Sequence, residues 1–120
     1  MRNDKLKDFE DMQVWQDAQD LAVEIYTDFA QVRDFSFCDQ IKRAGISISN
    51  NIAEGSERAS YADFARFLNI AKGSTGEVRS MYLLGERLNL VDPTRLPERR
   101  AACLEISKQL AGFAKYLRNK

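Results

Sequence analysis

The chain of 120 residues contains no histidine, only two cysteines and only two prolines. Without histidine it lacks the commonest general base and a frequent metal ligand of enzymes. The two cysteines, Cys38 and Cys103, are too few for a disulfide framework or a cysteine metal site. Both lie in apolar segments, so we expect buried, reduced thiols. We therefore expect no metal, no cofactor and no enzymatic activity.

Long apolar runs are missing as well, and the longest, such as residues 81–84, are only a few residues. A membrane-spanning helix needs about 20 apolar residues, so we expect no membrane partner. The N-terminal sequence MRNDKLKDFEDM is charged throughout and has no apolar signal core. These features favour a cytoplasmic protein.

Charge is balanced overall, with 18 basic and 18 acidic residues, but it is distributed unevenly. Residues 1–31 hold three basic and eight acidic groups, whereas residues 95–120 hold seven basic and two acidic groups. The two ends of the chain are therefore electrostatically complementary.

Apolar residues recur at spacings of three and four in four segments, the pattern of amphipathic helices. We predict helices at about residues 12–32, 37–54, 61–90 and 97–118, preceded by a polar arm at 1–11. The first of these carries the stripe Trp15, Ala18, Ala22, Ile25 and Phe29, widened by Leu21 and Tyr26. Because the connections are short, the sequence predicts an all-α, up-down-up-down four-helix bundle over residues 12–120, with the first and last helices as neighbours.

Capping residues and glycines refine these helices. Ser36 and Ser60 are expected N-caps, each followed three residues later by aspartate. Pro97 fits a first helical turn, and Gly55 is expected to end the second helix as a left-handed residue. Gly45 lies inside a helix and indicates a close approach by another helix.

The segment 72–76, KGSTG, allows two interpretations. It either breaks the third helix or lies within one continuous helix whose small residues permit close packing; the unbroken apolar spacing favours the second. The segment only superficially resembles a phosphate-binding loop, because it lacks a GKS or GKT ending and a preceding strand.

The most specific stretch is 40–58, QIKRAGISISNNIAEGSER. Polar residues recur there one position out of step with the apolar stripe: Gln40, Arg43, Ser47, Asn51 and Glu54. A buried Arg43 or Glu54 would need a partner, since unpaired buried charge is costly. We interpret this stripe as a subunit interface; the alternative is a solvated stripe with intrahelical pairs.

The same stretch resembles the signature of a bacterial four-helix bundle family encoded in intervening sequences of 23S rRNA genes. The matching positions are Gln40, Arg43, Ala44, Ser47, Ile48, Asn51, Ile52, Ala53, Glu54 and Gly55, followed by Arg58, Ser60, Phe64, Phe67, Leu68, Ile70, Ala71, Gly73, Ser74 and Glu77. The resemblance implies a ring-like homopentamer and kinship with accessory proteins of diversity-generating retroelements, which bind nucleic acid and a reverse transcriptase. Arg58 and Glu77 join the polar stripe in the candidate interface.

Two non-enzymatic functions follow. The first is an oligomeric scaffold or adaptor, whose protein partner the sequence does not identify. The second is an RNA- or DNA-binding accessory protein, because cations gather in the last helix: Arg99, Arg100, Lys108, Lys115, Arg118 and Lys120. The alternative for these cations is that they face the acidic first helix or solvent.

Overall fold

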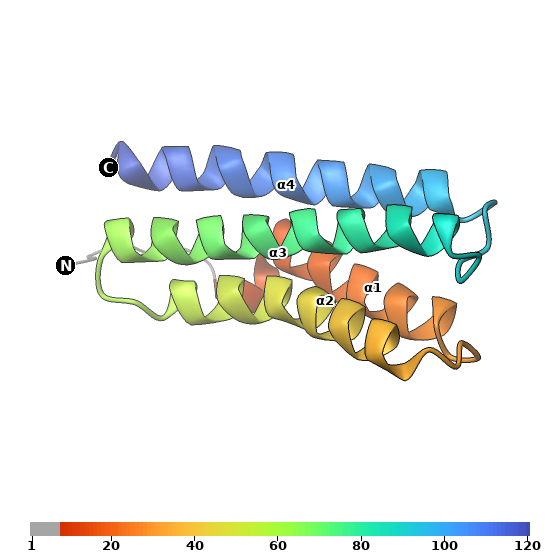
Figure 1. Cartoon of the computed structure of the whole chain (residues 1–120). Helices are drawn as coiled ribbons and strands as arrows, with labels where there is room; N and C mark the ends of the chain where they lie inside the picture. The colour runs from red at the N-terminus through yellow and green to blue at the C-terminus, as the bar shows by residue number, and fades with distance from the viewer. Residues whose placement is uncertain (1–7) are drawn as a thin grey trace.

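Four α-helices form the part of the chain that the computed structural model describes, residues 8–120 (Figure 1). They are α1 (Gln13–Asp28), α2 (Phe35–Ser56), α3 (Tyr61–Arg87) and α4 (Leu96–Arg118), and no strand occurs among residues 8–120. A short 3-10 helix, η1 (Phe9–Asp11), precedes them, and the ring of Phe9 packs edge-on against Trp15 at 5.2 Å. Residues 1–7 of the expected polar arm lie outside the described residues.

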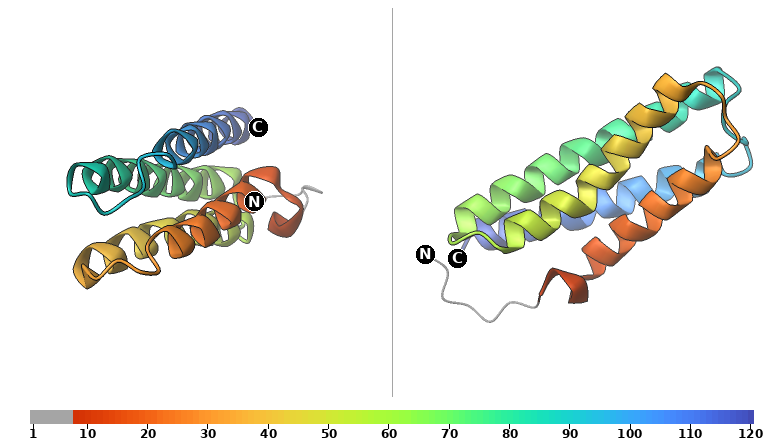
Figure 2. Two further views of the ribbon diagram at one scale, coloured as in Figure 1. Left: turned by 90° about the vertical axis from the view of Figure 1, so that its right-hand side faces the viewer. Right: turned by 90° about the horizontal axis from the view of Figure 1, so that it is seen from below.

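Consecutive helices run in opposite directions, and their connections alternate between the two ends of the molecule (Figure 1). Seen end-on, the helices take the four corners of a bundle, so that α1 lies beside both α2 and α4 (Figure 2). The bundle measures 48 × 21 × 20 Å. The predicted up-down-up-down four-helix bundle is therefore confirmed.

Two expected helix boundaries are wrong at the turn between α1 and α2. The first helix ends at Asp28 instead of residue 32, and Phe29 leaves the helix while staying in the core. The second begins at Phe35, because the carboxylate of Asp34, not the hydroxyl of Ser36, accepts a hydrogen bond from the Phe37 amide at 3.1 Å. A carboxylate satisfies an orphan amide of the first turn as well as a hydroxyl does.

Gly55 was expected to end α2 as a left-handed residue, and this is wrong. It lies inside the last turn, and no described glycine has a positive φ. A Cβ on Gly55 would stand 2.7 Å from the Cβ of Phe67, so glycine is needed there for close approach of α3. The same argument confirms Gly45, where a Cβ would lie 2.6 Å from Cδ1 of Ile25 on α1.

The third helix is continuous through residues 72–76, as the spacing favours. The Ser60 hydroxyl caps it by accepting from the Asp63 amide at 3.1 Å, as predicted. A Cβ on Gly73 or Gly76 would meet nothing within 4 Å, so close packing inside the monomer is not the reason for these glycines. The helix ends at Arg87 rather than residue 90, just before Asn89, which has a φ of 58°.

The core is a single apolar cluster to which every helix contributes, including Ile25, Ile48, Leu68 and Leu110, each fully buried. Burying each such side chain contributes about 1.5–3 kcal/mol before chain entropy is counted. Within residues 8–120, none of the helices is long and apolar enough to cross a bilayer.

Candidate functional site

The polar stripe of α2 faces α3 within the same chain. Gln40 donates from Nε2 to the Glu77 carboxylate at 2.9 Å, and the hydroxyls of Ser47 and Ser74 lie 2.9 Å apart. Asn51 donates to the carbonyl and the hydroxyl of Ser47, at 2.8 and 2.9 Å. The hydrogen bonds expected across a subunit interface are therefore made inside the monomer.

The charged members of the stripe are not buried, so that part of the expectation is wrong. Arg43 and Glu54 are both exposed, because at 100° per residue they lie at the outer edge of α2. Arg58 pairs with Glu54 at 2.8 Å and lies over the ring of Phe67. Arg43 makes no ion pair or hydrogen bond with the described residues. The pair between Glu54 and Arg58 is local, four residues apart, but Arg58 lies two residues beyond the end of α2, so it is not the intrahelical pair of the alternative interpretation.

Beside this stripe, α3 and the residue that caps its C-terminal end expose three large apolar side chains. Ile70, Leu84 and Leu88 are 41%, 46% and 49% exposed, and at 3.6 residues per turn they fall on one side of the helix. We call these three residues the α3 ridge. Leu84 and Leu88 continue the apolar spacing of the third helix, because an apolar residue at the edge of such a stripe has the same spacing as a buried one.

A second apolar surface lies between α1 and α2. An open groove of about 610 Å³ runs between the two helices, lined by Gln19, Ala22, Val23, Tyr26, Thr27, Ala30 and Ile46. Sequence reasoning placed Tyr26 in the core stripe, but its ring is exposed, as are Val23 and Ile46. We call this surface the α1–α2 groove. The interruption of the acidic face of α1 by Val23 is the signal that would have indicated it.

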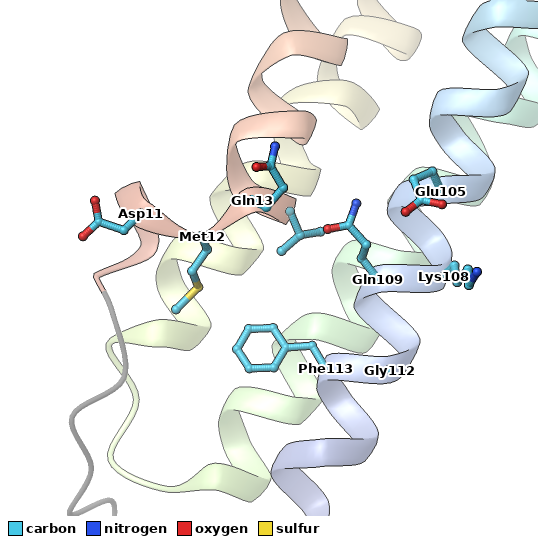
Figure 3. Close-up of a pocket in the computed structure, with 9 residues that line it drawn as sticks. Asp11, Met12, Gln13, Glu105, Lys108, Gln109, Gly112 and Phe113 are labelled. Carbon is cyan, nitrogen blue, oxygen red and sulfur yellow. The ribbon is translucent and has the colours of Figure 1, made fainter.

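A further opening of about 500 Å³ separates the start of α1 from the second half of α4 (Figure 3). Figure 3 shows Gln13 and Gln109 reaching toward it from the two helices, above Met12 and Phe113. The side-chain amides of Gln13 and Gln109 both donate to the Asp17 carboxylate, at 2.8 and 2.9 Å. The hydrogen bond from Gln109 joins α4 to α1 at the upper end of the opening. The lining offers an apolar floor and a polar rim but neither a serine nor a cysteine nucleophile.

Arg99 is the one expected nucleic-acid contact that the fold buries. It is 5% exposed and donates to Asp28 from Nε at 2.7 Å and from a terminal nitrogen at 3.1 Å. Its guanidinium also lies 3.2 Å from Glu24. The complementary charges at the two ends of the chain thus meet inside the monomer, as the neighbouring positions of the first and last helices predict. Arg99 is therefore buried and does not belong to the exposed cations.

The buried cluster joins three helices. Tyr82 of α3 donates to Asp28 at 2.6 Å, and Arg95 contacts the other carboxylate oxygen at 3.2 Å. Burial by itself would raise the pKa of Asp28, but the hydrogen bonds from Arg99 and Tyr82 outweigh it and hold that pKa below its ordinary value. Burial and the hydrogen bond to Asp28 raise the pKa of Tyr82 far above its ordinary value. This cluster acts as a structural anchor between α1, α3 and α4.

The remaining cations of α4 stay on the surface, and α3 adds two more. Lys120 lies over the rings of Tyr61 and Tyr116, whereas Lys72 is exposed and Arg79 lines a small cavity between α3 and α4. Lys108 lines the opening between α1 and α4. We call the following set the α3–α4 basic face: Lys72, Arg79, Arg100, Lys115 and Arg118. None of the five forms an ion pair with the described residues. Lys72 and Arg79 are seven residues apart, about two helical turns, so the sequence alone could have predicted that they lie on the same side of α3.

Within residues 8–120, the cysteines and acidic residues are the groups on which metal binding and nucleophilic chemistry would depend. No group of three or more Cys, Asp or Glu there is placed to hold a metal ion. Cys38 and Cys103 are buried and unpaired with each other. Burial raises the pKa of Cys103 to about 11, so its thiol is protonated and a poor nucleophile near neutral pH.

Comparison with known proteins agrees with the fold. The chain is similar to a protein of unknown function from the S23 ribosomal protein family of Bacteroides thetaiotaomicron, with 28% identity and a TM-score of 0.80. That match covers 85% of this chain and 98% of the other. A search of curated proteins gives no match. The family model of the 23S rRNA-intervening sequence protein matches residues 10–112, and the chain therefore belongs to this family.

Proposed function

We propose that the protein is a non-enzymatic homo-oligomeric scaffold that assembles through its α2–α3 face. The single observation that carries this proposal is the α3 ridge, three large apolar side chains left exposed in the monomer. They lie beside a stripe in which Gln40 and Ser47 are already hydrogen-bonded to Glu77 and Ser74 of α3, so contact there leaves those two side chains with their partners. The family resemblance implies a ring of five subunits.

Burying the α3 ridge alone does not supply enough free energy for a stable association of subunits. Completing the burial of three half-exposed side chains contributes about 1 kcal/mol each, or about 3 kcal/mol in total. Association costs about 4–15 kcal/mol in lost freedom of motion. A stable assembly therefore has to bury a second surface together with the ridge.

Light scattering coupled to size exclusion tests the scaffold. At micromolar concentration we expect a particle of about five times the 13.7 kDa chain mass. Leu84→Asp introduces a charge into the ridge and is expected to release monomers of unchanged helicity, while Arg43→Ala is expected to weaken the assembly. Ala101→Asp, on the exposed side of α4, is the matched control. A wild-type monomer refutes the proposal.

A second function, binding of RNA or DNA, is favoured by the α3–α4 basic face. Five cations from two helices lie on this face with no ion-pair partner among the described residues, which leaves them available to phosphates. A ring would repeat the face and raise a weak affinity by multivalency. Neutralising phosphates releases counterions, so such binding weakens steeply with salt.

Titration of a structured RNA at two salt concentrations tests this function. Arg100→Ala and Lys115→Ala are each expected to reduce the salt slope by about 1. Arg66→Ala is the control, because its guanidinium already pairs with Asp63 at 2.9 Å. Absence of binding at low salt, or binding that salt does not weaken, contradicts the proposal.

A further inference from the structure

A small cavity lies between α3 and α4, on the side of the bundle that carries the α3–α4 basic face. Its volume is about 30 Å³, and it is lined by Thr75, Gly76 and Arg79 of α3 and by Cys103 and Ser107 of α4. A spacing of four separates Thr75 from Arg79 and Cys103 from Ser107, which places each pair on one side of its helix. Because α3 and α4 are antiparallel neighbours, these two sides face each other across the cavity (Figure 1).

The polar side chains at the mouth of this cavity are hydrogen-bond donors without an acceptor. The guanidinium of Arg79 carries five N–H donors, and the hydroxyl of Ser107 adds one more. Both side chains are half-buried, and neither forms a hydrogen bond or an ion pair with the described residues. No acidic residue lines the cavity. Polar groups that lose water normally gain a hydrogen-bond partner, so this arrangement favours a ligand that accepts hydrogen bonds.

The floor of the cavity is neutral. Thr75 and Cys103 are each 1% exposed, and the Thr75 hydroxyl donates to the Ala71 carbonyl at 2.9 Å. Burial raises the pKa of Cys103 to about 11, although the cation of Arg79 acts to lower it. The thiol is therefore uncharged near neutral pH and does not repel an anion. Arg79 is the charged group among the five lining residues, so the cavity itself carries a positive charge.

The surroundings of the cavity are also cationic. Lys72 lies two turns before Arg79 on the same side of α3, and Arg100 lies one turn before Cys103 on α4. The carboxylate of Glu86 follows Arg79 by two turns on that side of α3. Lys72, Arg100 and Glu86 are exposed, and none of them forms an ion pair with the described residues. Three cations against one carboxylate leave a positive potential that draws anions to this part of the surface.

We propose that this cavity binds a phosphate group, with Arg79 and Ser107 donating hydrogen bonds to its oxygens. A water-sized group needs about 10–15 Å³ of such a cavity, so about 30 Å³ admits two phosphate oxygens. A Cβ on Gly76 would meet nothing within 4 Å, which leaves that side of the cavity open to the rest of the ligand. Free phosphate and the phosphodiester of a nucleic acid both present two unbridged oxygens. The nucleic-acid source rests on the second function proposed above, whereas the free-phosphate source does not.

Calorimetric titration of sodium phosphate into the full chain, at constant ionic strength with chloride as the balancing anion, tests the site. We expect saturable binding of one phosphate per chain. Arg79→Gln is expected to weaken this binding at least about tenfold, because it removes a charge-assisted hydrogen bond, and Ser107→Ala by about two- to tenfold. Arg87→Gln is the matched control, since it removes the same charge from an exposed position of α3. We expect this control to bind phosphate like the wild type, and all three variants to keep the helical circular dichroism signal.

Competition between phosphate and RNA identifies the source of the ligand. A structured RNA is titrated with and without saturating sodium phosphate, again at constant ionic strength. If a backbone phosphate occupies the cavity, free phosphate weakens RNA binding to the wild type but leaves RNA binding to Arg79→Gln unchanged. If phosphate binds while RNA does not, or without affecting RNA, the cavity is a site for free phosphate.

Two results would overturn the phosphate site. The first is the absence of saturable phosphate binding to the wild type. The second is an equal loss of affinity in Arg79→Gln and Arg87→Gln, which would indicate a general attraction to cations in place of a site. RNA binding without phosphate binding would overturn the phosphate site and leave the nucleic-acid function intact, whereas phosphate binding without RNA binding would do the reverse.

Discussion

Replacing Asp28 by asparagine removes the carboxylate that joins α1 to α3 and α4. The side chain of Asp28 is 1% exposed and accepts hydrogen bonds from Arg99, Tyr82 and Arg95. Asparagine has nearly the same shape but no charge, so it leaves the guanidinium of Arg99, itself almost fully buried, without its main counter-ion. We expect Asp28→Asn to destabilise the fold more than any exposed ion-pair substitution.

The magnitude follows from the partners that remain. Removing one member of a buried ion pair costs about 3–5 kcal/mol, because the other charge is left uncompensated. Arg99 keeps Glu24 at 3.2 Å, and asparagine keeps one acceptor oxygen. We therefore expect Asp28→Asn to lower the free energy of unfolding by about 3 kcal/mol, the lower end of this range. For a domain of this size that corresponds to about 12 °C in melting temperature.

Urea denaturation followed by circular dichroism, at one fixed protein concentration, measures this loss. Asp63→Asn is the control, because its ion pairs with Arg66 and Arg58 are partly exposed and worth less than about 1 kcal/mol. A loss below about 1 kcal/mol for Asp28→Asn would refute the reasoning, since it would mean that the buried guanidinium does not depend on this carboxylate.

The pH dependence of the same pair of proteins checks the electrostatic origin. The pKa of Asp28 is lowered in the fold, whereas an unfolded aspartate titrates near about 3.9. A group of this kind stabilises the fold above its unfolded pKa and loses that contribution as pH falls through its native pKa. The stability difference between wild type and Asp28→Asn is therefore expected to be complete at pH 7 and to shrink below about pH 4.

Three further predictions concern the core and the helix contacts. Ile48→Asp is expected to abolish the helical circular dichroism signal, because Ile48 is fully buried, whereas Arg43→Ala is expected to keep it. Gly55→Ala is expected to lower the free energy of unfolding by about 1–3 kcal/mol in urea titrations, since the added Cβ would meet Phe67 and the Phe64 backbone. Gly76→Ala is expected to raise the free energy of unfolding by up to about 1 kcal/mol, because a Cβ there meets nothing within 4 Å. Cys103, with a pKa of about 11, is expected to resist iodoacetamide at pH 8 until the protein is unfolded in urea.

Much of the architecture could be read from the sequence, because it depends on local periodicity. Spacings of three and four determine the inner side of each helix, and the short connections restrict neighbouring helices to opposite directions. Gly45 was interpretable for the same reason: glycine in a helix interior is unfavourable unless another helix comes close. The family signature in residues 40–55 was also sufficient, and the family model confirms it.

The candidate surfaces could not be read in the same way. Periodicity gives the side of a helix on which a residue lies, but not which other helix covers the edges of that side. Arg43 and Arg99 illustrate this, since both accompany an apolar stripe, yet Arg43 is exposed and Arg99 is buried against Asp28. Tyr26 likewise follows the core spacing but borders an open groove.

Composition and spacing by themselves determined that this protein is a bundle of four helices with an apolar core, because each helix needs only its own residues to define its buried side. The tertiary structure alone decided which polar groups are paired, since a hydrogen bond or ion pair depends on the rotation of two helices against each other. Arg99, expected on the surface from the sequence, is buried, and it and Tyr82 both donate hydrogen bonds to Asp28. The tertiary structure also left the α3 ridge and the α1–α2 groove exposed, because a four-helix bundle covers the inner side of each helix and leaves its outer edges uncovered.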